Sequence, residues 1–430
     1  MDALATPAQR RQLEQQDRTS IAAHQLERFQ QLLQTILPHN AFYQRKFTDA
    51  GVALPIDSWS KFRQLPFTTK EELVSAATPS GQPGHLTWPI DHYTRLHRTS
   101  GTRGRPLMIM DRPEDWEWWI ATWQYVLDAA EVTAADRVMM AFSFGPFIGF
   151  WSAFDAVTAR RAMAIPAGGM STLARWDLLQ ASEATVVCCT PSYALRMAEV
   201  AAQQQIHPTT PNVRCLIVAG EPGGSIPSVR RRIEQAWQCR VVDHCGATEV
   251  GPWGYADPEG VGLHVIESEF IVEFLSLKDD TPAGEGELSE IVLTTLGRAG
   301  CPVIRYRTGD LARPSWQHAK KNQFVFLPGG ALGRIDDMLI IRGMNVFPSS
   351  VEAVIRQFPA IAEFRLTALK EGTMDALRVE VEGDPIDAPG VANSLQTQLG
   401  LKIAVQTVPT GSLPRFEGKA ERFVDRRTEP

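Results

Sequence analysis

Residues 185–224 read TVVCCTPSYALRMAEVAAQQQIHPTTPNVRCLIVAGEPGG, and this stretch decides the fold class. An apolar run of strand length at 185–189 leads into a helical stretch at 191–204, and a second apolar run at 215–219 ends in a glycine-rich turn. A buried strand, a crossover helix and a second buried strand are the repeating unit of a parallel sheet. The stretch therefore predicts an α/β protein with a parallel sheet in its core.

The same alternation extends to both sides of this stretch. Further strand-like runs lie at 138–142, 162–165 and 240–243, and another helical stretch lies at 225–237. Ligands of such open sheets bind at the carboxyl ends of the strands, so we expect the functional site in the loops that follow these runs. The tryptophans at 116–123 recur at helical spacing, and we expect them to pack in the core rather than to bind substrate.

The pattern predicts two domains, residues 1–335 and 336–430. An amphipathic helix at 21–37 opens the first domain. After the parallel-sheet region, longer strand-like segments separated by turn residues predict a mainly antiparallel β subdomain. These segments are 264–277, 286–296 and 323–327.

The second domain has its own compact β/α alternation, which predicts a small α+β domain. Ser349 can cap a helix that runs to about Phe358. The remaining elements are strands at 363–369, 377–381 and 402–408 and a helix at 391–399.

Bulk composition excludes several classes of protein. The 430 residues carry a formal net charge of -6, which gives no general attraction to nucleic acid or to an anionic membrane surface. The six cysteines show no CxxC spacing, which is typical of reduced thiols rather than of a disulfide framework. No segment is apolar for the length of a bilayer span. We expect a soluble cytoplasmic protein, and whether it forms a homodimer is left open.

Two glycine-rich loops are candidate phosphate and nucleotide sites. The first is TSGTRGRP at 99–106, whose hydroxyls, glycines and arginines can surround phosphate oxygens, although an ordinary turn is an equal alternative. The second is AGEPGG at 219–224, which follows a predicted buried strand and precedes a helix. A nucleotide would lie at this place in such a sheet; the alternative is a turn that uses glycine for its geometry.

Two further loops carry carboxylates suited to a nucleotide. In DHCGATEVG at 243–251, the hydroxyl of Thr248 beside the carboxylate of Glu249 could bind a phosphate oxygen and Mg²⁺. In RYRTGD at 305–310, Asp310 lies in a tight turn and could accept both ribose hydroxyls. A surface loop and a hairpin turn are the respective alternatives.

The last two motifs lie at the predicted domain join and near the C-terminus. They are GRIDDMLIIRGMNVFP at 333–348 and PRFEGKA at 414–420. Each of the six motifs is weak alone, but their order along one chain is specific. With TPSYALRMAE at 190–199, they make the sequence from about His97 onward resemble the adenylate-forming superfamily of acyl-CoA synthetases, luciferases and peptide-synthetase adenylation domains, and most closely the phenylacetate-CoA ligase family.

This resemblance implies a large N-terminal adenylate-forming domain and a small mobile C-terminal domain that together use ATP, Mg²⁺ and coenzyme A. Lys419 would bridge the substrate carboxylate and the α-phosphate, Thr248 would bind that phosphate, and Glu249 would hold Mg²⁺. Asp336 would be the hinge between the domains. The implied nucleotide and coenzyme contacts are Thr99, Ser100, Gly101, Thr102, Gly104, Glu221, Pro222, Asp243, Cys245, Gly246, Asp310, Arg334 and Gly343.

The acyl pocket is predicted beside the end of a strand, at an aromatic and glycine-rich segment. Its implied residues are Phe142, Phe144, Gly145, Phe147, Gly220 and Ala247. An aromatic lining would suit an aryl or arylacetic acid, whereas core aromatics around a turn are the alternative.

Several positions depart from the pattern of the family. Cys245 stands where relatives have an aromatic side chain against adenine, and Arg103 replaces a threonine of the phosphate loop. The cysteines that form a zinc site in some relatives are missing, so we predict no structural zinc; pairing of Cys301 with His264 is a minor alternative.

The predicted reaction activates a small-molecule carboxylic acid as acyl-AMP and transfers the acyl group to coenzyme A. Transfer to a carrier-protein thiol, or to another acceptor, is the alternative within the family. A noncatalytic nucleotide-binding protein is the alternative from another class, against which Glu249, Asp310 and Lys419 argue.

Overall fold

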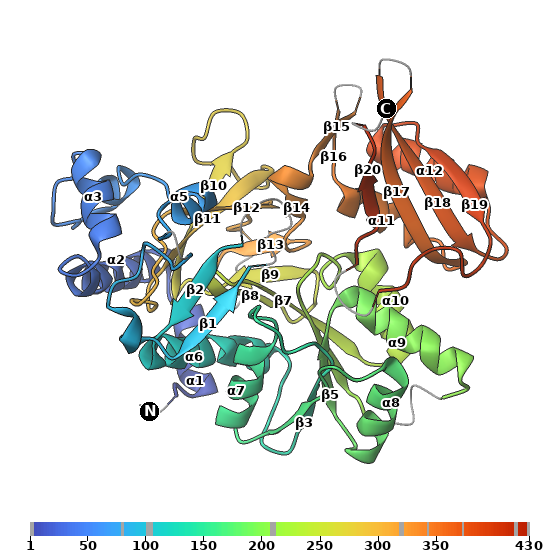
Figure 1. Cartoon of the computed structure of the whole chain (residues 1–430), viewed down its shortest axis with the longest axis horizontal. Coiled ribbons are helices and arrows are strands. Elements are labelled where there is room, and N and C mark those ends of the chain that lie inside the picture. The colour runs from blue at the N-terminus through green and yellow to red at the C-terminus, as the bar shows by residue number, and fades with distance from the viewer. Residues whose placement is uncertain are drawn as a thin grey trace.

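A computed structural model of the chain has a large mixed α/β body and a smaller C-terminal sheet unit beside it (Figure 1). The structure describes residues 4–78, 81–99, 106–206, 212–317, 322–341, 344–371, 374–416 and 420–427. None of the helices within these ranges is long and apolar enough to cross a membrane.

The N-terminal helices pack on one side of the large body. They are α1 (Pro7–Glu14), α2 (Arg18–Ile36), α3 (Ala41–Asp49), α4 (Trp59–Arg63) and α5 (Lys70–Ser75). Helix α2 confirms the amphipathic helix predicted at 21–37, and it begins three residues earlier because Asp17 caps it by accepting a hydrogen bond from the Ser20 amide. Its buried stripe includes Ile21, Phe29 and Ile36.

The central sheet has eight strands in the order β13-β9-β8-β7-β6-β5-β3-β4. Its parallel part consists of β3 (Arg137–Met140), β4 (Met163–Pro166), β5 (Val186–Cys189), β6 (Cys215–Val218) and the start of β7 (Arg240–Ala247). The linking helices are α7 (Trp151–Ala159), α8 (Thr172–Ala181), α9 (Pro191–Gln203) and α10 (Pro227–Trp237), with α6 (Pro113–Ala129) before β3. The predicted parallel α/β core is confirmed.

Both faces of this sheet are buried, which explains the continuous apolar runs. In β5, Val186 and Cys188 pack into one hydrophobic cluster, whereas Val187 and Cys189 pack into a second cluster on the opposite face. A strand buried on both sides needs an apolar residue at every position instead of alternation.

The antiparallel pairing is confirmed for all three predicted segments, but only some of their strands form a separate sheet. A four-stranded sheet contains β10 (Phe270–Ser276), β11 (Ser289–Thr295), β12 (Tyr306–Ala312) and β14 (Gly333–Arg334). The predicted strand at 264–277 is instead split, because β9 (Gly262–Val265) pairs with β8 (Gly251–Ala256) in the central sheet. The segment at 323–327 contributes β13 (Phe326–Pro328), which also joins the central sheet.

The C-terminal unit has a hydrophobic cluster of its own, and its sheet order is β19-β18-β17-β20. Its elements are β15 (Leu339–Ile341), β16 (Met344–Val346), α11 (Pro348–Ile355), β17 (Ile361–Glu371), β18 (Met374–Gly383), α12 (Ala388–Leu399), β19 (Ala404–Val408) and β20 (Phe423–Asp425). The unit lies against α9 and α10 in Figure 1. The boundary between 335 and 336 stays a prediction; it falls in a short 3-10 turn at Ile335–Asp337.

The predicted cap at Ser349 is wrong. Phe347 is the N-cap of α11, and Ser349 lies in the first turn of the helix. The Ser349 hydroxyl donates to the carbonyl of Leu332, so it ties the helix to the segment before the turn instead of capping it.

Candidate active site

The predicted phosphate loop connects two strands of a hairpin. Strand β1 (Arg95–Arg98) pairs antiparallel with β2 (Met108–Asp111). At the base of the loop, the Thr99 amide donates to the Leu107 carbonyl at 3.0 Å, and the Leu107 amide donates to the Thr99 hydroxyl at 2.9 Å. The other predicted loop residues, Ser100, Gly101, Thr102, Arg103 and Gly104, lie outside the described residues.

The loop after β6 places Glu221 between the two parts of the chain. Its Oε1 accepts the Ser192 amide at 2.7 Å, and its Oε2 accepts the Ala420 amide at 2.9 Å. Burial raises the pKa of Glu221. The sequence did not predict this link to Ala420, and the predicted contact of Glu221 and Pro222 with adenine stays a prediction. Gly220 has a positive φ of 93°, a conformation that favours glycine.

Strand β7 carries the next predicted residues at its carboxyl end. Asp243 is buried and accepts the Ser225 hydroxyl at 2.6 Å, and burial raises its pKa to about 6. Burial also raises the pKa of the Cys245 thiol, so this side chain is neutral at physiological pH. Gly246 is exposed and Ala247 half-buried.

Glu249 follows this strand and faces two groups that the sequence did not point to. Its Oε1 accepts the Tyr306 hydroxyl at 3.4 Å and lies 3.8 Å from Nζ of Lys70 on α5. Thr248 beside it is buried, and the carbonyls of both residues accept hydrogen bonds from Arg298. Lys70, Tyr306 and Arg298 are distant in the chain from Glu249, so only the fold brings them to it.

Asp310 and Arg334 are brought together as paired residues of β12 and β14. Arg334 Nη1 donates to Asp310 Oδ1 at 2.9 Å, and Asp336 lies 3.9 Å from the same guanidinium. Burial, followed by the charge of Glu249, raises the pKa of the Tyr306 hydroxyl, which is also within the electrostatic influence of Asp310 and Arg334. The loops after β7 and the strands of the β subdomain thus form one polar site, whose ribose contacts stay a prediction.

The predicted acyl segment follows β3 and forms an aromatic group. Phe142 and Phe147 meet edge to face at 5.6 Å, and Phe144 meets Trp151 in the same way at 4.7 Å. The indole of Trp151 donates to the Gly145 carbonyl at 3.0 Å. The three phenylalanines are half-buried. Their contact with an acyl group stays a prediction.

The tryptophans of α6 are core residues, as the sequence predicted. Trp116, Trp119 and Trp123 are 4%, 2% and 1% exposed. The ring of Trp123 lies 4.4 Å from that of His244, whose Nδ1 donates to the Gly254 carbonyl at 2.8 Å. Burial lowers the pKa of His244 to about 4, so the imidazole is neutral.

Cys301 does not lie against His264. Its sulfur is 2.9 Å from Nε2 of His85, and His264 bonds the Phe324 carbonyl at 3.0 Å. Within the described ranges, no three His, Cys, Asp or Glu side chains are grouped as metal ligands. The absence of structural zinc stays a prediction, and elemental analysis of purified protein would contradict it by finding about one zinc per chain.

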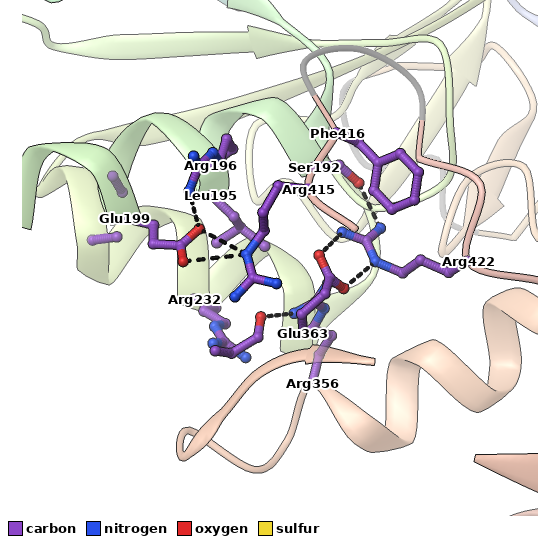
Figure 2. A pocket seen from close by; sticks show the side chains of 13 residues that line it. Ser192, Leu195, Arg196, Glu199, Arg232, Arg356, Glu363, Arg415, Phe416 and Arg422 are labelled. Atoms are coloured by element: carbon purple, nitrogen blue, oxygen red, sulfur yellow. Dashed lines mark hydrogen bonds and ion pairs between the residues drawn. The ribbon is translucent and has the colours of Figure 1, made fainter. Parts of the chain in front are cut away.

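A cavity of about 240 Å³ marks the contact between the large body and the C-terminal unit (Figure 2). Two arginines reach across it: Arg415 belongs to the PRFEGKA motif, and Arg422 follows the motif. Arg422 donates to the Ser192 hydroxyl at 2.7 Å, and Arg415 lies 3.3 Å from Glu199 on α9. The motif's predicted Lys419, and Gly343 near the domain join, lie outside the described residues.

Comparison with known proteins decides the family. The AMP-binding enzyme family matches residues 39–271, and its C-terminal domain matches residues 343–427. The chain belongs to the AMP-binding enzymes. Among its curated relatives, a phenylacetate-coenzyme A ligase of Escherichia coli is 30% identical and one of Thermus thermophilus is 27% identical. The alignment with the Escherichia coli enzyme covers 95% of each chain, and the alignment with the Thermus thermophilus enzyme covers 97% of this chain and 99% of the relative. This similarity places the chain in the phenylacetate-CoA ligase family.

Solved structures of one relative in two states allow the arrangement of the two parts to be compared. A 2-hydroxyisobutyryl-CoA ligase in the postadenylation state, 27% identical, superposes with a TM-score of 0.91 over 99% of this chain and 94% of that one. The same ligase in the thioesterification state, with the same coverage of both chains, gives 0.74. Because the two structures are of one ligase, the difference in TM-score reflects its conformation, and the two parts of this structure are arranged more like its postadenylation state.

Proposed function

We propose that this protein converts an aryl or arylacetic acid into its coenzyme A thioester, by way of an acyl adenylate made from MgATP. The observation that carries the proposal is the polar site itself. Glu249, Asp310 and Arg334 lie together in this site, and the amide of Ala420, next to Lys419, bonds Glu221 in the loop after β6. Adenylation needs a carboxylate that holds the metal, a carboxylate that binds the ribose and a lysine that contacts the reacting oxygens.

The first half-reaction requires two anions to meet. A carboxylate is a poor electrophile, so ATP converts one of its oxygens into an AMP leaving group. The protein contributes positioning and neutralisation of charge at phosphorus. Mg²⁺ would neutralise phosphate charge when bound, and the half-buried carboxylate of Glu249 beside the Thr248 hydroxyl is a donor set that suits it. Lys419 would supply the second cation, between the substrate carboxylate and the α-phosphate.

The second half-reaction brings a thiol to the same acyl carbon. Lys419 would occupy the approach to that carbon in the postadenylation arrangement, so the C-terminal unit has to move before coenzyme A can react. Asp336 lies in the turn between β14 and β15, where a change of backbone angles would reorient the C-terminal unit.

The aromatic segment after β3 supports the choice of acid. Phe142, Phe144 and Phe147 present half-buried rings next to a strand end, where flat aryl groups could pack. The relatives named phenylacetate-coenzyme A ligase support the same class. The structural relative named 2-hydroxyisobutyryl-CoA ligase makes a small hydroxy acid the second candidate.

A panel of acids, assayed for AMP formation with and without coenzyme A, tests the proposal. Phenylacetate, benzoate, 2-hydroxyisobutyrate and acetate would separate the acid classes. We expect CoA-dependent AMP formation to be fastest with an aryl or arylacetic acid. Exchange of pyrophosphate into ATP without any effect of coenzyme A would favour a carrier-protein acceptor. Absence of exchange with every acid would favour a noncatalytic nucleotide-binding protein.

A further inference from the structure

A buried ion pair between Arg298 and Asp111 lies behind the polar site. Arg298 and Asp111 are both 0% exposed in their side chains. Arg298 Nε donates to Asp111 Oδ1 at 2.7 Å, and Nη2 of the same guanidinium lies 2.6 Å from that oxygen. The indole of Trp119 also donates to Asp111 Oδ1, at 3.2 Å, and its ring faces the guanidinium at 5.2 Å.

The third nitrogen of Arg298 holds the backbone of the predicted metal and phosphate residues. Nη1 donates to the carbonyls of Thr248 and Glu249, each at 3.0 Å. A charged donor shared by two successive carbonyls fixes the peptide planes of this dipeptide, because rotation of either plane would leave a carbonyl or the guanidinium without its partner.

Asp111 connects the same pair to the phosphate loop. It is the last residue of β2, so it belongs to the hairpin whose connecting segment is the predicted phosphate loop. His97, on the other strand of the hairpin, lies 3.9 Å from Asp111 Oδ2. The pair therefore links the two elements that are predicted to contact the phosphates of ATP.

From these contacts we infer that Arg298 is a positioning residue for adenylation, which sets the Thr248–Glu249 backbone at a fixed place relative to the phosphate-loop hairpin through Asp111. The inference rests on the proposed function. Burying two charges is costly, and apolar side chains could fill the same space with similar stability, so the contribution of the pair lies in the two carbonyls that it orients. A lysine could keep the charge, but its single ammonium lacks the planar fork that reaches Asp111 and both carbonyls at once.

The test compares Arg298→Lys with the matched variant Arg10→Lys. Arg10 is also buried, and it bonds Asp128 at 2.6 Å and the Ala5 carbonyl, but it joins α1 to α6 and does not contact the motif loops. Three quantities are measured for each: the unfolding temperature, pyrophosphate exchange over a range of Mg²⁺ concentrations, and thioester formation from supplied acyl adenylate and coenzyme A.

We expect both variants to unfold at a lower temperature, and only Arg298→Lys to lose exchange, by about 100-fold, with a higher Mg²⁺ requirement. Thioester formation from supplied adenylate should be much less affected, because pyrophosphate has left before that step and only the predicted contact of Thr248 with the α-phosphate remains. Asp111→Asn keeps the side-chain shape and should also lower exchange more than thioester formation, although by a smaller factor. This variant replaces Arg298→Lys in the test if Arg298→Lys does not fold.

Equal loss of both half-reactions in the folded Arg298→Lys or Asp111→Asn variants, or exchange no lower than in Arg10→Lys, would overturn the inference. A wild-type protein that exchanges no pyrophosphate with any acid would instead contradict the proposed function.

Discussion

Two polar groups lie close to the Glu249 carboxylate, and neither of them is itself a metal ligand in the predicted site. The Lys70 ammonium and the Tyr306 hydroxyl approach one of its oxygens. An ammonium at 3.8 Å neutralises part of the carboxylate charge but leaves the second oxygen for a cation. The sequence indicated Glu249, but it could not indicate Lys70, because this residue comes from a different part of the chain.

We expect Glu249→Gln to lower pyrophosphate exchange by about 100-fold or more, since the amide keeps the shape and removes the charge that holds Mg²⁺. Raising Mg²⁺ should restore only part of the rate. Near-normal exchange at saturating metal would show that Glu249 does not hold the ion.

The hydrogen bonds of Glu382 should make the stability of the C-terminal unit depend on pH. Its carboxylate bonds Arg415, and it accepts the amides of Gly411 and Leu413 at 2.7 and 3.0 Å. The bond from Arg415 is the main reason that its pKa is lowered to about 2. A carboxylate whose pKa is lower in the folded than in the unfolded state stabilises the fold above its ordinary pKa, about 4.3, and this stabilisation is lost as the pH falls toward 2.

Glu382→Gln should therefore cost about 2 kcal/mol of stability at pH 7, the usual contribution of a hydrogen bond to a charged group, and progressively less between about pH 4 and pH 2. Thermal unfolding of wild type and variant across this range measures the difference. Glu380→Gln is the control, because Glu380 forms a more exposed pair with Arg365 and should have a smaller effect. A difference between wild type and Glu382→Gln that does not change with pH would contradict the expectation.

At the scale of elements, α9 and the loop after β6 form the surface on which the C-terminal segment rests. Ser192 at the start of α9 gives its amide to Glu221 and accepts a hydrogen bond from Arg422 at its hydroxyl. Glu221 also holds the Ala420 amide. The bonds from Arg422 and Ala420 join the two parts of the chain, and both have to break if the C-terminal unit rotates.

Glu221→Gln should weaken this contact. The glutamine side chain accepts hydrogen bonds only through its oxygen, so its NH₂ group would face the backbone N–H of either Ser192 or Ala420, and two donors cannot bond each other. We expect about tenfold slower pyrophosphate exchange, from the usual cost of an unmet buried hydrogen bond. Thioester formation from supplied acyl adenylate should be retained. Glu199→Gln removes a half-exposed pair at the same contact and should change exchange little. Slower thioester formation in Glu221→Gln would argue for a general structural role.

At the scale of the whole molecule, the two half-reactions should respond in opposite ways to changes in the C-terminal unit. Lys419→Ala should abolish adenylation, since two anions would have to approach without a neutralising cation, and should leave thioester formation from supplied acyl adenylate intact. Single-turnover assays of each half-reaction measure the split.

Asp336→Pro should show the reverse bias, with adenylation retained and thioester formation lost, because proline fixes φ at the turn that has to move. Circular dichroism and unfolding temperature would control for folding of both variants. If a folded Lys419→Ala variant lost both half-reactions equally, the alternation between two arrangements would have to be given up.

The sequence by itself determined the parallel core and the family, and it indicated the loops of the candidate site. These features depend on local patterns, such as the fully apolar strand at 186–189 and motif residues that follow strand ends. Sequence-based prediction failed where pairing between distant segments decides the structure. No local pattern shows that the segment 264–277 is divided between two sheets, or that the Ser349 hydroxyl bonds the Leu332 carbonyl. Only the tertiary structure placed Lys70 and Tyr306 at Glu249 and Arg298 behind it, because these contacts join segments far apart in the chain, and a buried arginine finds its partners only when the core has closed around it.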